Sequence, residues 1–318
     1  MTTPIVFPGL GIELTIDRVA FSLFGWNIYW YGVIIGCGFL LGLAFSMRQA
    51  PKLGLKADDL LDMMFAAVPA GIVGARAYYV IFYLDLYRDA SGAIDWGEVV
   101  AIWDGGLAIY GGLIGAVLAA AVFCRVRKLP FWTVADCASY GLLIGQMMGR
   151  WGNFINQEAY GGPCTAPWRM GLTVGGTYIE VHPTFLYESL WNLIGLVLLY
   201  AVVRPRRKFD GQLFASYILW YGLGRAWIEG MRTDSLYLFG TGIRVSQALA
   251  ILSAAIALGA ILFLLRRQKR RPVPLYAERM AERERASEAT PDAERIPEEE
   301  QRQASAPAEI PKSDREKE

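Results

Sequence analysis

Seven apolar runs, each close to the roughly 20 residues that an α-helix needs to cross a bilayer, constrain this chain more than any other feature. They lie near residues 26–47, 59–84, 105–124, 131–149, 183–203, 211–230 and 244–265. Polar residues interrupt the fourth and sixth runs, which are therefore the weakest of the seven. The pattern predicts an all-α membrane protein with seven transmembrane helices.

Three other segments complete the predicted organisation. Residues 1–25 alternate apolar and polar side chains too irregularly for a span, so we expect short extracytoplasmic strands or an interfacial segment there. In a small extracytoplasmic insertion at about 160–182, Gly175 and Gly176 lie between β-favouring runs and predict a hairpin. Residues 266–318 are charged and almost free of aromatic side chains, which predicts a disordered tail. Short helical stretches are possible in its segment "YAERMAERERA".

The connections between the runs differ in positive charge. The first, third and fifth connections and the start of the tail hold fifteen Lys and Arg residues, whereas the N-terminal segment and the other connections hold five. The fifteen are Arg48, Lys52, Lys56, Arg125, Arg127, Lys128, Arg204, Arg206, Arg207, Lys208, Arg266, Arg267, Lys269, Arg270 and Arg271. Because cytoplasmic loops carry the excess of Lys and Arg, we expect the N-terminus outside and the tail in the cytoplasm.

Composition excludes several classes of partner. The formal net charge of +1 gives no indication of nucleic-acid binding, and none is expected. The four cysteines form no C-x-x-C pair, so neither a disulfide framework nor a zinc site is indicated. We expect no metal and no cofactor. No internal repeat is apparent, which argues against a transporter built from inverted halves.

With this orientation, polar side chains from five segments reach the outer boundary of the membrane. The stretch "GRWGNFINQEAYGG" (149–162) ends the fourth run and contains Arg150 and Asn153. Tyr221, Arg225 and Glu229 follow one another at i, i+4 and i+8 in the sixth run and therefore share a helix face. The other segments supply Tyr29, Tyr31, Arg76, Tyr78, Tyr79, His182, Tyr187 and Glu188.

This combination of side chains predicts an anion-binding site. A helix continuing from Arg150 to Glu158 would place Arg150, Asn153 and Gln157 on one side, with guanidinium and amide groups suited to phosphate. The carboxylates of Glu158, Glu188 and Glu229 can neutralise part of the arginine charge. The sequence therefore predicts a phospholipid site that faces the outer leaflet. The alternative is that the pairs Arg150–Glu158 and Arg225–Glu229 only tie helices together.

The polar stretch is similar to the signature of the prolipoprotein diacylglyceryl transferase family. Five further blocks agree with that family in order and spacing, and the likeness covers roughly residues 5–265. The blocks are "WYG" (30–32), "GARAYYV" (74–80), "WDGGLAIYGGLIGA" (103–116), "HPTFLYES" (182–189) and "YGLGRAWIEGMRTD" (221–234). The resemblance implies a multi-pass enzyme of the bacterial cytoplasmic (inner) membrane, with 26–265 as the catalytic domain.

The resemblance also implies a reaction. A diacylglyceryl group would move from phosphatidylglycerol to the thiol of the lipobox cysteine of a prolipoprotein, forming a thioether and releasing glycerol-1-phosphate. The partners would be phosphatidylglycerol and prolipoprotein signal peptides, and a monomer is expected. By matching position, Arg150 and Arg225 would bind the phosphate, and Glu158 and Glu229 would hold these arginines. Lipid contacts would come from Tyr31, Asn153, Gln157, Gly161, His182 and Tyr221, and Tyr110 is a further candidate for a catalytic residue.

One block departs from the family pattern. Many members have a histidine where this chain has Tyr110, and the only histidine here is His182. A tyrosine with a reference pKa near 10 is a poor general base, so a positively charged site that favours the thiolate is the better prediction. Glu158, Glu229 and His182 are the possible proton acceptors. His182 can equally serve as a turn before a helix, and Tyr110 can simply bond the lipid.

Two other classes of protein fit the apolar pattern. A transporter or flippase for an anionic lipid would carry polar residues along the whole membrane depth, whereas here they concentrate in the outer half. A non-catalytic receptor or assembly protein needs no charged residues on several spans at one level. Both alternatives are therefore less well supported than the transferase.

Overall fold

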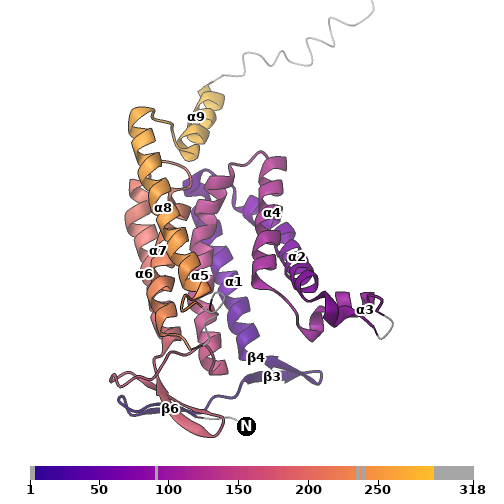
Figure 1. Cartoon of the computed structure of the whole chain (residues 1–318). Helices are drawn as coiled ribbons and strands as arrows, with labels where there is room; N and C mark the ends of the chain where they lie inside the picture. Colours follow the sequence, from indigo (N-terminus) through magenta and orange to yellow (C-terminus); the bar gives the residue numbers. More distant parts are fainter. Residues whose placement is uncertain (1–3, 90–91, 234–236, 238–240, 290–318) are drawn as a thin grey trace, which may run out of the picture. The chain divides into compact units, whose positions relative to one another are not determined.

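The computed structural model describes residues 4–89, 92–233, 237 and 241–289. The chain divides into two units, Met1–Ala277 and Glu278–Glu318. The first unit is mostly helical and carries a small sheet (Figure 1). The helix α9 (Tyr276–Ala289) begins in the first unit and continues into the second. It covers the stretch of the tail that was predicted to be helical. The rest of the predicted tail, 290–318, lies outside the described residues.

Within the described ranges, seven long helices coincide with the seven apolar runs. They are α1 (Trp30–Gln49), α2 (Ala57–Phe82), α4 (Ile109–Val126), α5 (Phe131–Asn156), α6 (Thr184–Leu198), α7 (Gln212–Ile228) and α8 (Val245–Arg270). Short helical turns are η1 (Ala50–Leu53), η2 (Leu84–Tyr87), α3 (Trp96–Val100), η3 (Ile102–Asp104), the π-helical η4 (Leu199–Val203), η5 (Arg204–Arg206) and η6 (Glu229–Met231).

Five of the described helical segments are long and apolar enough to cross a membrane, judged by length and composition. They are Trp30–Leu53, Ala57–Phe82, Ile109–Val126, Thr184–Arg206 and Val245–Arg270. The two long helices that do not qualify are α5 and α7, which are the fourth and sixth runs. α5 packs against α1, α4, α6 and α7, and several of its polar side chains, among them Thr133, Asp136 and Ser139, are buried.

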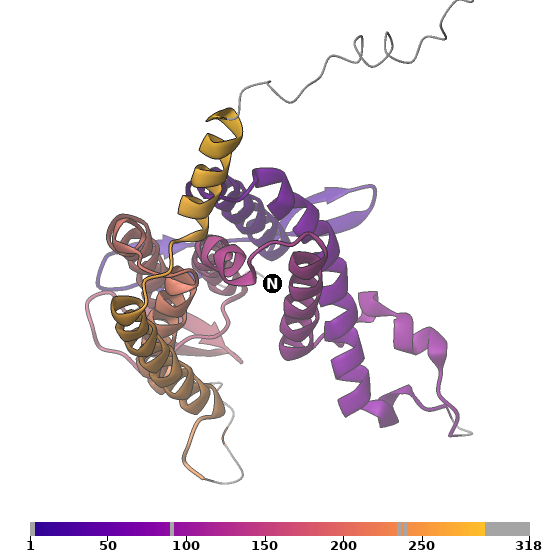
Figure 2. The same ribbon diagram turned by 90° about the horizontal axis from the view of Figure 1, so that it is seen from above.

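Small residues allow two helix pairs to approach closely. Gly42 of α1 faces Gly141 of α5, where an added Cβ would lie 2.9 Å from the carbonyl oxygen of Gly141. Gly74 of α2 faces Gly111 of α4, and an added Cβ there would lie 2.5 Å from the Gly111 oxygen. Such small residues let backbones pack by van der Waals contact in a membrane. Both views show α2 and α4 side by side (Figures 1 and 2).

The strands gather at one end of the helices (Figure 1). One antiparallel sheet has the order β2 (Ile12–Leu14), β1 (Ile5–Phe7), β5 (Met170–Val174) and β6 (Thr177–Val181), and β3 (Val19–Leu23) pairs with β4 (Trp26–Tyr29). The predicted hairpin is confirmed: Gly175 and Gly176 connect β5 to β6 with φ of 57° and 82°. Two positive φ values suit the tight turn of a two-residue hairpin.

The sheet packs directly on the ends of two helices. Ile5, Leu172 and Val181 are buried in one apolar cluster with Phe154 of α5 and Phe185 of α6. The rings of Phe154 and Phe185 lie 4.4 Å apart. The end of α5 and the start of α6, where the polar signature lies, are therefore fixed against a small folded cap. We call this end of the unit the sheet end.

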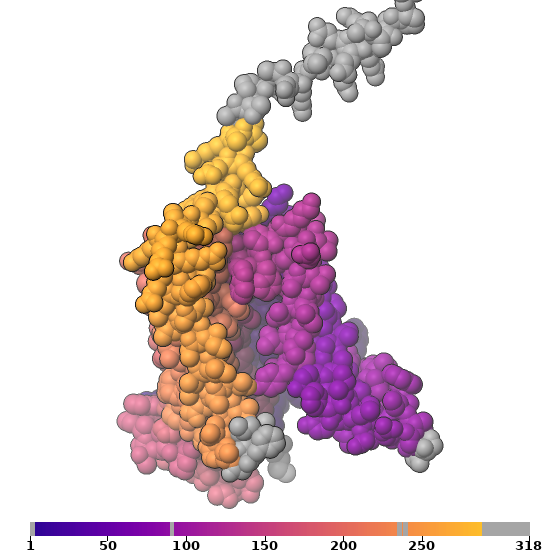
Figure 3. Space-filling view, turned by 45° about the horizontal axis from the view of Figure 1, so that its top comes forward, coloured from indigo at the N-terminus to yellow at the C-terminus, as the bar shows by residue number. Residues whose placement is uncertain are grey.

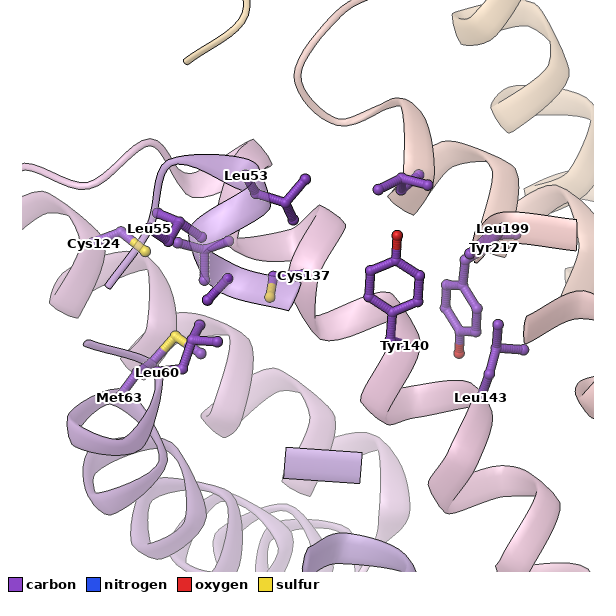
Figure 4. Packing of buried hydrophobic residues seen from close by; sticks show 13 residues of the cluster. Leu53, Leu55, Leu60, Met63, Cys124, Cys137, Tyr140, Leu143, Leu199 and Tyr217 are labelled. Atoms are coloured by element: carbon purple, nitrogen blue, oxygen red, sulfur yellow. The ribbon is translucent and has the colours of Figure 1, made fainter. Parts of the chain in front are cut away.

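A second core lies at the opposite end, where Leu53, Cys137, Tyr140 and Leu199 are packed together (Figure 4). Beside it the buried Asp136 accepts hydrogen bonds from the backbone N–H groups of Gly211 (2.8 Å) and Phe214 (2.9 Å) and pairs with Arg207. These bonds satisfy donors at the start of α7, so Asp136 fastens that helix to α5.

The surface view shows how the helices separate. On the face seen in Figure 3, a recess in which deeper atoms are visible separates the orange α8 from the magenta α4.

Candidate functional site

One buried carboxylate organises the charged side chains at the sheet end. Glu188, on the first half of α6, is 5% exposed. Its Oε2 lies 2.6 Å from Nη2 of Arg150 on α5, and its Oε1 lies 3.2 Å from Nη1 of Arg225 on α7. Arg232, just beyond α7, approaches the same Oε1 at 3.5 Å. Three guanidinium groups from separate segments thus surround a single carboxylate.

A second carboxylate completes this arrangement. Glu229, at the end of α7, is buried, and its Oε2 lies 2.6 Å from Nη2 of Arg225. Arg244, before α8, donates a hydrogen bond to the main-chain carbonyl of Glu229. We call Arg150, Arg225, Arg232, Glu188 and Glu229 the arginine cluster. Its three positive charges face two negative ones, so an anion is favoured beside it.

The end of α5 differs from the predicted continuous helix. α5 stops at Asn156, and Gln157 takes the left-handed conformation, with φ 55° and ψ 44°. The backbone N–H of Glu158 then donates to the carbonyl of Asn153 at 3.0 Å. The prediction that Gln157 shares a helix face with Arg150 and Asn153 is therefore wrong, because the chain reverses after Asn156.

The reversal brings Glu158 to amide groups instead of to an arginine. Its Oε1 accepts hydrogen bonds from Asn153 (2.9 Å) and Asn156 (3.3 Å), while the Oδ1 of Asn153 accepts one from Arg150 (3.2 Å). Glu158 therefore acts on Arg150 only through Asn153. The predicted direct pairing of Glu158 with an arginine is wrong. Glu188 occupies that position, and Glu229 pairs with Arg225 as predicted.

Three aromatic side chains lie near the cluster. Tyr221 precedes Arg225 by one turn of α7, and its ring stacks on that of Tyr217 at 6.0 Å. Tyr217 in turn accepts a hydrogen bond from Gln146 (2.8 Å). Tyr31 lies over Gly152, where an added Cβ would be 2.6 Å from its ring. Tyr31 is thus on α1, which contacts the last turns of α5. Tyr221 is on α7, the helix that carries Arg225.

His182 lies at the turn before α6, and its surroundings support the turn interpretation. Its backbone pairs with Gly161 and Gly162, with N···O distances of 3.0 Å for each bond. Its Nδ1 lies 3.2 Å from the hydroxyl of Tyr187, which accepts a hydrogen bond from Trp168 at 2.7 Å. A crevice of about 480 Å³ opens beside it, lined by Gly162, Pro163, His182, Gly230, Met231, Arg232, Thr233, Tyr237 and Arg244.

Gly161 is needed for close packing at this turn. An added Cβ would lie 2.7 Å from the Cβ of His182 and 3.2 Å from the carbonyl oxygen of Met231. We expect Gly161→Ala to lower the free energy of unfolding by about 1–3 kcal/mol through overpacking. Gly162→Ala is the matched control, because its nearest contact would be 3.8 Å. Denaturant titration of both variants in detergent measures the effect, and equal losses would contradict this reading.

Two residues that the sequence singled out, Tyr110 and Arg76, lie apart from the arginine cluster. Tyr110, the second residue of α4, is 53% exposed, and in the described part of the chain it is not hydrogen-bonded to the cluster. Arg76 is buried and donates to the main-chain carbonyls of Glu98, Val99, Ala101, Gly105 and Gly106. Arg76 therefore fixes the loop before α4, and the structure gives Tyr110 no link to the charges.

Sequence reasoning named Glu188 only as one of several possible partners and counted Arg232 only as a loop charge. The available signal was a carboxylate in the first turns of an apolar run, which is costly unless it is paired. Choosing Glu188 over Glu158 required knowing that α5 ends at Asn156. That end depends on the packing of α5 against the sheet.

The arginine cluster lies at one end of helices that are apolar enough to span a membrane, which is typical of a membrane protein. The comparison with known families is more specific. Residues 18–264 match the model of the prolipoprotein diacylglyceryl transferase family. The chain belongs to this family, as its signature indicated, and it is a transferase.

Curated relatives agree over most of their length. The chain is 47% identical over 262 residues to the phosphatidylglycerol–prolipoprotein diacylglyceryl transferase of Geobacillus kaustophilus (strain HTA426), covering 80% of this chain and 94% of that protein. It is 44% identical over 273 residues to the enzyme of the same name from Lysinibacillus sphaericus (strain C3-41), covering 83% and 97%. The Listeria welshimeri enzyme is 42% identical over 280 residues, covering 85% and 96%.

Proposed function

We propose that this protein transfers a diacylglyceryl group from phosphatidylglycerol to the lipobox cysteine of prolipoproteins, the first step of bacterial lipoprotein maturation. The observation that carries the proposal is the arginine cluster, with its excess positive charge beside a crevice that Arg232 and Arg244 line. In the reaction, the cysteine sulfur bonds to the glyceryl carbon that carried the phosphate. The bond from that carbon to the phosphate oxygen breaks, and glycerol-1-phosphate leaves.

Arg150 and Arg225 act on the leaving phosphate. Negative charge grows on its oxygens as the carbon–oxygen bond breaks, so their guanidinium groups stabilise the transition state more than the bound lipid. Glu188 and Glu229 hold both arginines in place before the lipid arrives. Asn153, hydrogen-bonded to Arg150, orients the head group, and Gln157, Gly161, Tyr31 and Tyr221 supply further contacts.

The thiol proton does not require a dedicated histidine. A free thiol with a pKa of about 8.5 costs only about 2 kcal/mol to ionise at pH 7, and nearby guanidinium charge lowers that cost. Glu229 is buried against Arg225, and the His182 ring faces Tyr187. The exposed Glu158, which among the described residues accepts hydrogen bonds from the amides of Asn153 and Asn156, is the better acceptor among the candidates. Tyr110 keeps only the role of a lipid contact.

The experiment that tests the function uses purified protein, phosphatidylglycerol micelles and a synthetic lipobox peptide. We expect the peptide cysteine to gain the mass of one diacylglyceryl group, with glycerol-1-phosphate in equal amount. Phosphatidylcholine in place of phosphatidylglycerol is the control donor. Release of glycerol-1-phosphate with no change in the peptide would indicate a lipase, and transport of lipid with no thioether would indicate a flippase.

The topology belongs to the same proposal. Seven spans, including α5 and α7, place the sheet end outside the bacterial inner membrane, with the site facing the outer leaflet and the tail in the cytoplasm. The three parts of the chain are then the segment 1–25, the transmembrane domain 26–265 and the tail 266–318. A monomer is part of the same proposal.

A labelling experiment checks this orientation. In a Cys37→Ser background, Thr177→Cys at the hairpin tip and Lys56→Cys at the opposite end are both exposed positions. We expect a membrane-impermeant maleimide to label Thr177→Cys in intact cells and Lys56→Cys only after lysis. The reverse pattern would place the arginine cluster where no exported prolipoprotein cysteine can reach it.

A further inference from the structure

A second group of cations lies at the end of the helices opposite the sheet. Gln49, the last residue of α1, is buried. Its Oε1 accepts hydrogen bonds from Nη1 of Arg204 (2.9 Å) and from Nζ of Lys52 (3.2 Å). The ring of Tyr200 lies beneath both cations, 4.2 Å from the Arg204 guanidinium carbon and 5.8 Å from Nζ of Lys52. Segments 155 residues apart in sequence thus bring two positive charges to one amide oxygen.

These two charges lack the compensation that Arg207 and Arg127 have at the same end. Arg207 pairs with Asp136, and Arg127 pairs with Asp62. Among the residues that the structure describes, no carboxylate lies within ion-pair distance of Lys52 or Arg204. Their partners are a neutral amide and an aromatic ring, which do not cancel the repulsion between like charges. An anion placed against this pair would do so.

The backbone is locally adapted to present the pair. α6 changes at Leu199–Val203 into the π-helical turn η4, a rare conformation that occurs often at functional sites. Tyr200 lies within this turn, and Arg204 follows it directly. The turn thus accompanies the stacking of the Arg204 guanidinium on the Tyr200 ring. Lys52, in η1, approaches the same Tyr200 ring from another segment.

The surface that leads to the pair is apolar. Leu193, Val197 and Tyr200 are exposed and follow one another at i, i+4 and i+7, so they share one face of the helical segment. Tyrosines are enriched where a membrane meets water. Since the segment Thr184–Arg206 is apolar enough to span a membrane, acyl chains would contact this face while a phosphate reached the cations.

We propose that Lys52, Arg204 and Tyr200 bind the phosphate of an anionic phospholipid in the leaflet at this end of the helices. The site is separate from the arginine cluster, because Arg204 lies about 24 Å along the helical segment from Glu188 at 1.5 Å per residue. Under the proposed topology it lies in the cytoplasmic leaflet, so its lipid is structural and is not the substrate.

Two double variants test the site. Lys52→Gln/Arg204→Gln removes the pair, and Lys56→Gln/Arg206→Gln removes the same number of charges from the same two connections. Native mass spectrometry in detergent then counts phosphatidylglycerol retained per protein over a lipid titration. Because the first variant loses two direct, charge-assisted contacts to one phosphate, we expect its affinity for one lipid to be about thirtyfold weaker. The second variant should stay within about threefold of the unchanged protein.

Several results would overturn the proposal. Equal lipid counts in the two double variants would show that the pair only packs on Tyr200. Equal retention of phosphatidylcholine would exclude a charge-selective site. Displacement of the bound lipid by millimolar inorganic phosphate would assign the site to a free anion.

A measurement on the unchanged protein tests the proposal even if the double variant does not fold. An amine-reactive reagent should label Lys52 less in phosphatidylglycerol than in phosphatidylcholine, with Lys56 as the internal reference, and equal labelling would again overturn the proposal. The outcome is distinguishable from failure of the transferase function. Lys52→Gln/Arg204→Gln should still modify the lipobox peptide in excess phosphatidylglycerol.

Discussion

Arg150→Ala is expected to lower kcat for thioether formation by about 10²–10³-fold, the range found when one preorganised donor to a developing anion is removed. Arg150 is the guanidinium that links both halves of the site, with Nη2 on Glu188 (2.6 Å) and Nη1 on Asn153 (3.2 Å). The measurement is single-turnover transfer from phosphatidylglycerol to a lipobox peptide. Arg225→Ala should fall in the same range, because Arg225 also approaches Glu188.

The matched control for this prediction is Arg169→Ala. Arg169 lies at the same end of the protein and pairs with Glu180 of β6, away from the cluster. We expect its kcat to stay within a factor of about three of the unchanged enzyme. If Arg150→Ala and Arg225→Ala both retained normal kcat while remaining folded, charge stabilisation by these arginines would not be the source of catalysis.

Glu188→Gln is expected to lower the free energy of unfolding by about 3–5 kcal/mol, as for breaking a buried ion pair by removing one partner. The variant keeps the shape of the side chain but removes the charge that three arginines share. Arg225 still has Glu229 in the variant, whereas Arg150 loses its ion pair with Glu188. Denaturant titration in detergent gives the measurement.

Glu180→Gln provides the comparison for Glu188→Gln. Its ion pair with Arg169 is part-exposed, with side chains 33% and 25% accessible, and exposed pairs contribute about 0–1 kcal/mol. A loss at Glu188 no larger than that at Glu180 would show that the cluster does not depend on its central carboxylate. The two variants make the same chemical change, so only the surroundings differ.

Much of the fold could be predicted because a membrane demands long apolar runs. The helices α1, α2, α4, α6 and α8 coincide with the five runs that are continuous enough to span. The β5–β6 hairpin followed from Gly175 and Gly176, since glycine adopts positive φ at little cost.

The site was predictable only in part. Arg150, Arg225 and Glu229 carry charges that are costly in an apolar run, so their presence indicated a shared site. Their pairing was not predictable, because it depends on contacts between helices. Glu188 meets Arg150 across 38 positions in sequence, and the left-handed Gln157 ends a stretch whose local pattern favours continued helix.

The pairing of β1 with β5 has a consequence for biogenesis. Val6 is opposite Gly171. The strand β1 is made first and can therefore pair with β5 only after about 165 further residues have been made. Contacts that distant form late during folding, after local ones. The cap over the ends of α5 and α6 would thus close last, after α1 to α5 and the hairpin have been made. A chain arrested before Met170 would expose the unpaired edge of β1 to the cell's quality-control proteases.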